Sequence, residues 1–437
     1  MEKAFLLVLL ITNSSRAFHL STLRNSQPPL PQKESKLREL YPSLMPFDNG
    51  TIMVDSLHTL FYQQYGSCNG IPALFLHGGP GAGCFPRHAR FFDPAKYRIV
   101  LLDQRGSGQS TPKGEIRNNT ICHLIQDCEI LRTKLQIGQW GLVLGGSWGS
   151  TLALAYAQTH PTKIRQLILR GLCLFRAQEV DWLFGSDGIS NDKRLQEQWK
   201  RFNIAVGIEG IDDNSHPRKS LYAYYDRLLS SDHSTRLNAA KSWAAWEHTV
   251  SSLRQDTDVK CSQEPIIFVY KQDRDNKRIW GTKNLEGEFN IWNDNQPLPE
   301  FRKMISYDKP SNHNDDSENI RPIQTTANFA SEEITNLGEQ FKNYVPAQAM
   351  LTCFYSVNRG YVMNQMNLLD QMHLIHHIPC IVIHGEQDFI CPIDSALDAC
   401  SKYPTMELRI PMGSGHSMYD PLITHELVTA TDQLAAR

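Results

Sequence analysis

The sequence predicts an α/β protein: a mostly parallel sheet covered by helices on both faces, with a mainly helical cap inserted into the chain. Two observations support this fold class. Continuous apolar runs alternate with segments of helical periodicity, which is typical of parallel strands buried on both faces. The pattern stops near residue 173, gives way to a helical, aromatic and polar stretch, and resumes near residue 378. With 437 residues, the chain is long enough for one large domain with an insertion or for two domains.

The elements of the core are expected in a definite order. Alternating segments at 51–55 and 58–62 predict an antiparallel strand pair that opens the sheet. Buried strands are expected at 71–76, 98–102, 142–144, 164–169, 378–383 and 406–410, and helices at 122–135 and 151–158. The second helix should end at Pro161, because proline cannot continue the helical hydrogen bonds.

The chain divides into four expected parts. Residues 1–40 form a targeting-like extension, 41–172 the first part of the core, 173–345 the cap with an irregular expansion at about 252–330, and 346–437 the second part of the core. Lys3, the apolar run 4–11 and the small-x-small sequence 15–17 have the layout of a signal peptide. This layout suggests secretory or organellar entry, and a cytoplasmic location is the alternative.

Composition narrows the classes of function. A net charge of −2 gives no indication of a nucleic-acid partner, and no apolar run approaches the ~20 residues that span a bilayer, so stable membrane insertion is not expected. The ten cysteines form no C-x-x-C pair, which argues against zinc-binding and thioredoxin-like sites. Reduced, mostly buried thiols are favoured over a disulfide framework, because a chain of this length can bury a core without such cross-links.

Gly145, Ser147 and Gly149 have G-x-S-x-G spacing, between an apolar run and a helix-forming segment. A sharp strand-to-helix turn leaves no room for side chains beside its central residue, so glycines flank it. The hydroxyl of Ser147 would stand clear at the sheet edge, and the N–H of Trp148 would point towards an oxyanion. An ordinary glycine-rich turn is the alternative, which the strand–turn–helix context disfavours. We therefore predict a nucleophilic serine.

Two further loops follow predicted strands. The glycine-rich segment 77–83 follows the strand at 71–76 and places glycine N–H groups where they can approach a reacting carbonyl. The loop at 103–110 contains Asp103 and Arg105, which we interpret as structural residues that tie loops together by hydrogen bonds.

The last two predicted strands supply the other members of a catalytic triad. Asp388 and His416 each follow one of these strands, and chemistry in open α/β sheets gathers at the carboxyl ends of strands. The order Ser…Asp…His goes with this type of serine turn. We expect His416 to take the proton of Ser147 and give it to the leaving amine, while Asp388 orients His416.

Glu386 and Asp394 are alternative candidates for the acid of the triad. Asp388 is favoured because a new helix is expected to begin soon after it, so that Asp388 itself lies on the loop that follows the strand.

Several longer motifs resemble those of the proline iminopeptidases (prolyl aminopeptidases). They are HGGPGAG at 77–83, DQRGSGQS at 103–110, GGSWGSTLALAYAQTHP at 145–161, RGLCLFRAQEVDW at 170–182, WAAWE at 243–247, NRGYVMN at 358–364, GEQDFICP at 385–392 and GSGHSMYDP at 413–421. The resemblance covers nearly all of 41–437 except the 252–330 expansion. It implies an α/β-hydrolase fold with a helical cap, release of N-terminal proline from short peptides, and no metal or organic cofactor. It also implies the triad Ser147, Asp388 and His416, and an oxyanion hole formed by the N–H groups of Gly79 and Trp148.

The same resemblance implies that Glu247 binds the free amino group of the substrate. On a helix, Trp243, Trp246 and Glu247 would share one face, so we expect aromatic walls for a proline ring beside a carboxylate for its ammonium. A surface carboxylate beside two core tryptophans is the alternative. The family usually has a second amine-binding glutamate, and the matching residue here is Thr352, which carries no charge.

Three functions therefore follow. The leading one is a serine exopeptidase that releases N-terminal proline by a Ser-His-Asp acyl-enzyme mechanism. A serine esterase or amidase with relaxed amine recognition is the alternative that Thr352 favours. A non-catalytic binding protein is disfavoured, because it would not need all three triad residues. The sequence predicts neither the natural peptide nor the oligomeric state.

Overall fold

A computed structural model describes residues 37–185, 193–208, 218–252, 265–273, 275–292, 337–358 and 367–436. The signal-like segment, most of the motif at 358–364 and much of the 252–330 expansion lie outside these residues. The predicted targeting role of the extension therefore stays a prediction.

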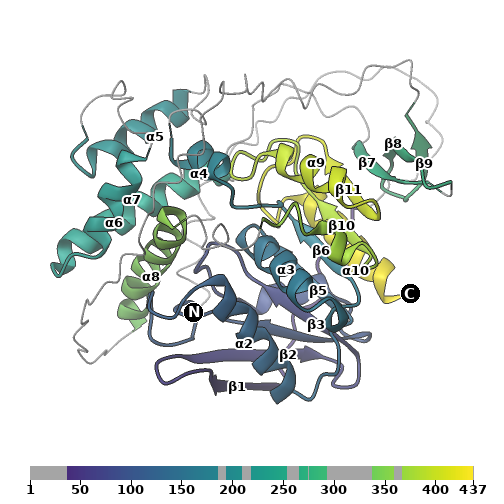
Figure 1. The fold of residues 1–437 in the computed structure, drawn as a ribbon, viewed down its shortest axis with the longest axis horizontal. Helices are drawn as coiled ribbons and strands as arrows, with labels where there is room; N and C mark the ends of the chain where they lie inside the picture. Colours follow the sequence, from purple (N-terminus) through teal and green to yellow (C-terminus); the bar gives the residue numbers. More distant parts are fainter. Residues whose placement is uncertain are drawn as a thin grey trace, which may run out of the picture. The chain divides into compact units, whose positions relative to one another are not determined.

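The described residues contain a sheet of eleven strands (Figure 1). Its order is β1 (Asp48–Met53), β2 (Thr59–Gly66), β4 (Tyr97–Leu102), β3 (Ile71–Leu76), β5 (Leu142–Gly146), β6 (Leu167–Arg170), β10 (Cys380–Ile383), β11 (Met406–Pro411), β7 (Ile267–Gln272), β8 (Arg278–Lys283) and β9 (Phe289–Ile291). The six strands from β4 to β11 in this order run parallel, and the strands at both edges pair antiparallel. The predicted parallel core and the antiparallel pair that opens it are confirmed.

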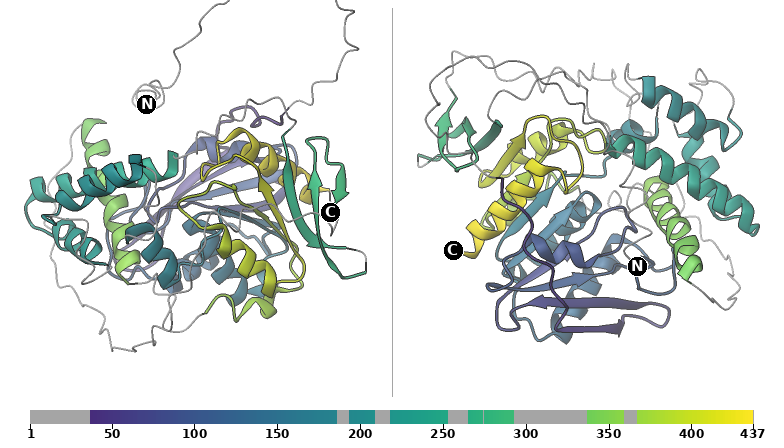
Figure 2. Two further views of the ribbon diagram at one scale, coloured as in Figure 1. Left: turned by 90° about the horizontal axis from the view of Figure 1, so that it is seen from above. Right: turned by 180° about the vertical axis from the view of Figure 1, so that it is seen from behind.

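Helices cover both faces of this sheet, as predicted. Helices α2 (Ile121–Lys134), α3 (Trp148–Thr159) and α9 (Ile393–Lys402) pack on one face, and α10 (Pro421–Ala435) packs on the other with the short helix η2 (Pro86–Phe91) (Figures 1 and 2). Successive residues of a strand point to opposite faces of the sheet. In β10, Val382 packs on the face covered by α2, α3 and α9, and Ile383 packs on the face covered by α10 and η2. Both layers are apolar, so each strand is a continuous apolar run.

The cap consists of the described helices α4 (Ala177–Phe184), α5 (Lys193–Ile204), α6 (Lys219–Leu228), α7 (His233–Ser252) and α8 (Leu337–Val357) (Figure 1). An aromatic cluster joins α4, α5, α6 and α7: the ring centroids of Phe202 and Tyr224 lie 4.1 Å apart, and those of Phe184 and Trp243 lie 4.7 Å apart. The boundary expected between residues 345 and 346 falls inside α8. This helix packs against α6 and α7 of the cap. That boundary therefore does not separate cap from core.

Part of the 252–330 segment is regular, which corrects the expectation of an irregular expansion within the cap. Strands β7, β8 and β9 form a meander whose first strand pairs with β11, so this part extends the core sheet (Figure 2). Ile267, Phe268 and Val269 of β7 are buried there. The meander is hard to predict from sequence because its strands are short and lie between polar runs rich in Asp and Asn.

A buried charged cluster anchors the meander to the core. The Nζ of Lys283 in β8 lies 2.9 and 3.0 Å from the two carboxylate oxygens of Glu426 in α10. The Nη1 of Arg409 in β11 contacts the same carboxylate at 3.0 Å. All three side chains are buried, so each charge depends on its partners rather than on water.

We predict that Lys283→Met lowers the free energy of unfolding by about 3 kcal/mol, because it leaves the buried Glu426 with one of its two cations. Urea unfolding measures the change. Lys277→Met, on the exposed turn between β7 and β8, is the matched control and should have no measurable effect. Equal stability of the two variants would show that the ion pair does not anchor the meander.

The core begins earlier than the boundary expected after residue 40. The backbone N–H of Arg38 donates to Nδ1 of His425 at 2.9 Å, and its guanidinium pairs with Asp432. Leu40 packs against the apolar layer around α10. These contacts place residues 37–40 with the core rather than with the extension.

A chain that starts at Leu37 is therefore expected to keep the activity and thermal unfolding temperature of the full chain. A chain that starts at Leu44 should unfold at a lower temperature, since it loses the contacts of Arg38 and Leu40. Thermal unfolding followed by circular dichroism separates the two. Poor solubility or lost activity of the chain that starts at Leu37 would mean that residues 1–36 support the core.

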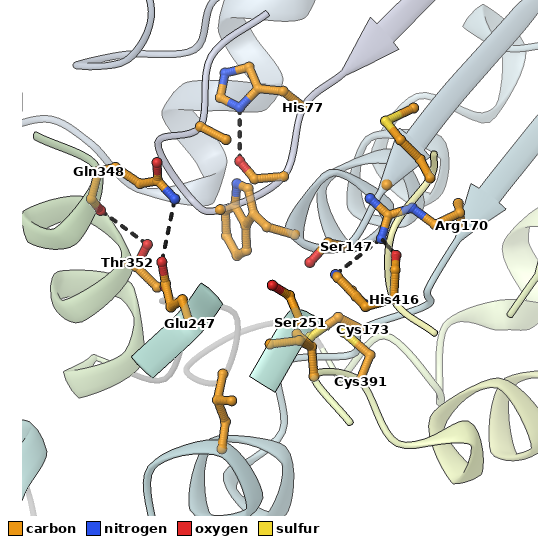
Figure 3. A pocket seen from close by; sticks show the side chains of 18 of the residues that line it. His77, Ser147, Arg170, Cys173, Glu247, Ser251, Gln348, Thr352, Cys391 and His416 are labelled. Atoms are coloured by element: carbon orange, nitrogen blue, oxygen red, sulfur yellow. Dashed lines mark hydrogen bonds between the residues drawn. The ribbon is translucent and has the colours of Figure 1, made fainter. Parts of the chain in front are cut away.

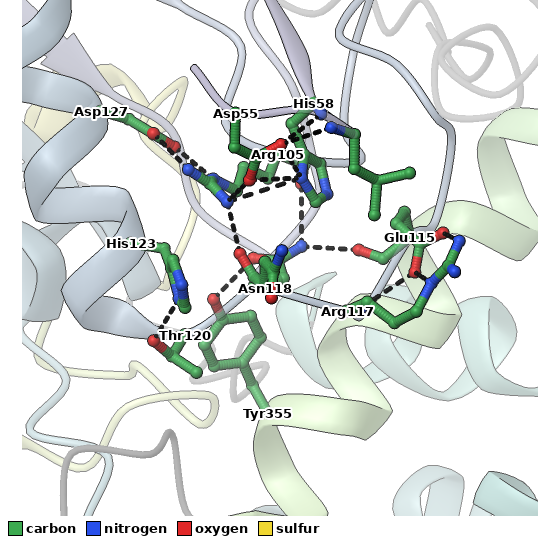
Figure 4. A network of polar contacts seen from close by, with 12 residues as sticks. Asp55, His58, Arg105, Glu115, Arg117, Asn118, Thr120, His123, Asp127 and Tyr355 are labelled. Carbon is green, nitrogen blue, oxygen red and sulfur yellow. Dashed lines mark hydrogen bonds and ion pairs between the residues drawn. The ribbon is translucent and has the colours of Figure 1, made fainter. Parts of the chain in front are cut away.

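Arg105 lies in the loop after β4 and holds this loop in place through ion pairs to other parts of the core (Figure 4). Its guanidinium lies 2.7 Å from both carboxylate oxygens of Asp127 in α2 and 2.6 Å from Asp55 between β1 and β2. In the same loop, Asp103 accepts a hydrogen bond of 2.6 Å from the N–H of Cys84. The structural role predicted for Asp103 and Arg105 is confirmed: they tie this loop to neighbouring loops and helices.

Two expectations from composition can be compared with the described residues. None of their helices is long and apolar enough to cross a membrane. Nine of the ten cysteines are described, and all nine carry free thiols, as predicted.

Candidate active site

Ser147 lies between β5 and α3 in a strained backbone conformation. Its φ of 55° and ψ of −127° are rare for a residue with a side chain. A Cβ on Gly145 would lie 2.1 Å from the carbonyl oxygen of Gly149, and a Cβ on Gly149 would lie 2.1 Å from that of Leu76. The G-x-S-x-G spacing is therefore imposed by close backbone packing.

His416 and Asp388 are in contact, as predicted. Nδ1 of His416 lies 2.7 Å from Oδ2 of Asp388, whose Oδ1 accepts hydrogen bonds from the N–H groups of Ile390 and Cys391. Burial alone would raise the pKa of Asp388, but its interaction with His416 and the hydrogen bond from the N–H of Cys391 hold this pKa below its usual value. Burial, with a contribution from Arg170, lowers the pKa of His416. The imidazole is therefore neutral at pH 7 and able to act as a base.

The rival acids lie elsewhere. Glu386 accepts a hydrogen bond from the N–H of Gly413 at 2.8 Å, and Asp394 lies in the first turn of α9. Asp388 is the carboxylate that meets the imidazole.

Ser147 and His416 line the same pocket, and Arg170 takes part in their arrangement (Figure 3). Nε2 of His416, the atom that would take the proton of Ser147, accepts a hydrogen bond from Nη1 of Arg170 at 3.0 Å. The same Nη1 donates to the carbonyl oxygen of His416 at 2.9 Å. Arg170 ends β6, and its register partner in β5 is Gly146, the residue before Ser147.

The glycine-rich loop after β3 is held beside Ser147 by a buried imidazole. Nδ1 of His77 donates to the carbonyl oxygen of Gly78 at 2.9 Å, and its Nε2 accepts from the N–H of Gln104 at 3.1 Å. Burial lowers the pKa of His77 to about 4, which keeps the ring neutral. Gly79 has a φ of 112°, a conformation that favours glycine, and lines the pocket with Trp148. Both residues named for the oxyanion hole thus lie at the pocket wall.

The pocket has a volume of about 450 Å³ and lies between the core and the cap. Figure 3 shows Ser147, His416 and Arg170 on one side of it and Glu247 on the other. Much of the wall is apolar and includes Phe175, Val180, Leu183, Phe184, Ile390 and Met418. A volume of this size suits a small ligand or the end of a peptide.

Glu247 of α7 is a carboxylate held by neutral groups. Nε1 of Trp243 donates to its Oε1 at 2.9 Å, and Nε2 of Gln348 lies 3.4 Å from its Oε2. Thr352 also contacts this carboxylate, and its hydroxyl donates to the carbonyl oxygen of Pro80 at 2.9 Å. Burial raises the pKa of Glu247 to about 7, because hydrogen bonds from neutral donors only partly replace water. A ligand ammonium would give this carboxylate a positive partner.

Comparison with known proteins agrees with this geometry. The sequence matches the family model described as the alpha/beta hydrolase fold over residues 72–421. It is 35% identical over 396 residues to a proline iminopeptidase of Xylella fastidiosa, across 91% of this chain and 99% of that protein. It is 34% identical to the proline iminopeptidases of Xanthomonas citri (over 400 residues, 91% of this chain and 100% of that protein) and Arabidopsis thaliana (over 401 residues, 91% and 83%). The chain belongs to the proline iminopeptidase family.

For this member of the proline iminopeptidase family, one expectation about the substrate pocket is wrong. Trp243 and Trp246 were expected to form its aromatic walls, but both are buried inside the cap and neither lines the pocket. The stripe of α7 that faces the pocket consists of Ala244, Glu247, His248 and Ser251. The rotation of α7 about its axis directs the two tryptophans into the aromatic cluster of the cap. Trp243 therefore contributes to the pocket only indirectly, through its hydrogen bond to Glu247.

Two further residues of the proline iminopeptidase site were missed by sequence reasoning. Gln348 precedes Thr352 by one helical turn, so its place beside Glu247 follows once Thr352 is assigned to this wall. Arg170 ends an otherwise apolar strand within the RGLCLFRAQEVDW motif, and a charge in that position was the available signal.

Proposed function

We propose that this protein is a serine exopeptidase that releases N-terminal proline from short peptides. The observation that carries the proposal is one pocket with Ser147 and His416 on one side and Glu247 on the other. An aminopeptidase needs both features: a nucleophile with its base at the scissile carbonyl, and a carboxylate that binds the free amine nearby. Membership of the proline iminopeptidase family also supports an exopeptidase that acts on N-terminal proline.

In the proposed mechanism, His416 Nε2 takes the hydroxyl proton of Ser147 as Oγ attacks the carbonyl carbon of the N-terminal proline. The N–H groups of Gly79 and Trp148 stabilise the oxyanion of the tetrahedral intermediate. His416 then gives the proton to the leaving amine, and an acyl-enzyme remains. Water, activated by the same imidazole, hydrolyses this ester and releases proline. Asp388 stabilises the imidazolium at both steps.

The amine side of the pocket explains why cleavage would be confined to the first residue. The ammonium of the terminal proline would pair with Glu247, and its ring would contact the apolar wall. Helices α7 and α8 close the pocket behind Glu247 through Gln348 and Thr352. A residue placed before the proline would replace the ammonium with a neutral amide and require room in this wall.

A serine esterase or amidase with relaxed amine recognition is the second candidate. The observation that favours it is the neutral Thr352, which leaves Glu247 as the carboxylate that faces the substrate amine. The pocket is also lined by Glu179, but the carboxylate of Glu179 accepts hydrogen bonds from Arg176 and from the hydroxyl of Ser395, each at 2.7 Å. Glu179 is therefore already paired and does not replace the second amine-binding glutamate.

Mass spectrometry of peptide digests tests the proposal. A peptide that begins with proline should lose that single residue, and the same peptide with alanine added before the proline should stay intact. A short-chain ester should be hydrolysed with a much lower kcat/KM. Rapid ester hydrolysis without release of proline would favour the second candidate.

The pH dependence of the two substrate classes provides a further prediction. The pKa of Glu247 is raised to about 7, and its ionised form is the one that binds an ammonium. For a proline amide, kcat/KM should therefore fall as the pH drops through about 7. For an uncharged ester, the acid limb reports His416, whose pKa is lowered, and should lie at lower pH. Coincident acid limbs for the two substrates would contradict this role of Glu247.

A further inference from the structure

Arg170 is a buried cation that contacts the catalytic histidine but has no role in the Ser-His-Asp mechanism described above. Its guanidinium lies at the end of β6, and among the described residues its hydrogen bonds both go to His416 rather than to a carboxylate. Burial lowers its pKa, which reflects the cost of removing the charge from water. A cation kept at such a cost beside a neutral imidazole needs a reason in the chemistry of that imidazole.

The hydrogen bonds define which nitrogen of His416 carries the proton. Arginine donates and cannot accept, so Nε2 offers its lone pair to Arg170. Nδ1 therefore carries the proton and donates it to Asp388 at 2.7 Å. This is the tautomer that a general base for Ser147 requires, and the ring is held at both nitrogens. The lone pair that must accept the Ser147 proton is, however, already engaged.

Gly146 makes room for this contact. A Cβ on Gly146 would lie 2.7 Å from Nη2 of Arg170, and its three nearest neighbours would all be atoms of that guanidinium. The absence of a side chain immediately before Ser147 thus lets the guanidinium sit between the serine turn and His416.

We propose that Arg170 is a positioning residue that holds the lone pair of His416 Nε2 in the resting enzyme and releases it to the hydroxyl of Ser147 as acylation begins. In that exchange the Oγ–H bond of Ser147 breaks and the Nε2–H bond of His416 forms. The second bond, to the carbonyl oxygen of His416, keeps the guanidinium beside the ring. The inference rests on the proposed nucleophilic role of Ser147.

The proposal has a consequence for pH dependence, because a cation beside Nε2 opposes protonation of the ring. Among the described residues, the titratable groups around the pair include Asp388, His384 and Cys391 after β10, Tyr419 after His416, and His88 of η2. Asp388 favours the imidazolium and Arg170 disfavours it. Removal of the Arg170 charge should therefore make His416 easier to protonate.

The test is the pH profile of kcat/KM for an uncharged ester in the full-length enzyme. Arg170→Gln should move the acid limb to higher pH by about one unit. Arg170→Lys keeps the charge, so its limb should stay within about half a unit of the wild type. Both variants should lower the plateau by about tenfold, because neither side chain places a donor nitrogen where Nη1 of Arg170 contacts both Nε2 and the carbonyl oxygen of His416. Arg165→Gln, at an exposed position two residues before β6, is the charge-matched control and should leave the limb in place.

Gly146→Ala tests the same contact without removing the arginine. Its methyl group should push the guanidinium from Nε2 and move the acid limb upward, in the same direction as Arg170→Gln. An unmoved limb in both Gly146→Ala and Arg170→Gln, or an equal shift in Arg170→Gln and Arg170→Lys, would overturn the proposal. If Arg170→Gln does not fold, Gly146→Ala alone decides.

The rate at which a fluorophosphonate labels Ser147, measured across the same pH range, separates this inference from the proposed function. The labelling rates of the variants should show the same displaced limbs as the ester. A wild-type enzyme that is not labelled at Ser147 would contradict the proposed function itself. Labelling with identical limbs in all variants would contradict only the role of Arg170.

Discussion

Ser147→Ala is expected to lower kcat/KM for a proline amide by about 10⁴-fold or more, because the covalent acyl route is lost. The hydroxyl group is small, and the backbone at this turn is constrained by Gly145 and Gly149 rather than by the side chain. The fold should therefore survive the substitution. Steady-state kinetics with an anilide of free proline measures the loss, and circular dichroism verifies the fold.

Two comparisons sharpen this result. Ser401→Ala, on the exposed side of α9, removes a hydroxyl far from the pocket and should leave activity within about twofold. His416→Ala should match Ser147→Ala, and the double variant should be hardly worse than either, since the two residues act as one unit. A Ser147→Ala enzyme that keeps a tenth of its activity would rule out the triad.

Glu247→Gln is expected to lower kcat/KM for proline amides by roughly 10²-fold, which corresponds to ~3 kcal/mol. The amide has nearly the same shape and can still accept the hydrogen bond from Trp243, so the wall of the pocket should stay in place. What is lost is the negative charge opposite the substrate ammonium. Kinetics at pH 8, where Glu247 is ionised, should show the full effect, given its pKa of about 7.

The specificity of this effect distinguishes amine recognition from support of the fold. Hydrolysis of an uncharged ester by Glu247→Gln should change by less than about threefold. Glu197→Gln removes an exposed carboxylate from the cap helix α5 and is the matched control. Equal losses on amide and ester would assign Glu247 to the fold or to the triad.

The nucleophile turn could be predicted because its constraints are local. Gly145 and Gly149 are required by backbone atoms of neighbouring segments, whatever the rest of the chain does. The parallel strands were predictable for a similar reason: burial on both faces leaves a continuous apolar run. Asp388 and His416 followed from the rule that functional loops lie at the carboxyl ends of such strands.

The residues that could not be predicted depend on packing between distant parts of the chain. Arg170 and His416 are 246 positions apart, and their contact needs β6, β10 and β11 to lie side by side in the sheet. Trp243 and Trp246 are on the expected helix, but its rotation is set by the aromatic interior of the cap. The meander β7–β9 is recognisable only through its pairing with β11.

The most direct test of the account compares anilides of free and N-acetylated proline with the wild-type enzyme at pH 8. Both substrates have the same ring and the same scissile bond, and they differ in the charge that Glu247 is proposed to bind. The account predicts that acetylation lowers kcat/KM by about 10²-fold or more. Equal cleavage of the two anilides would contradict recognition of the free amine and, with it, the assignment as an exopeptidase.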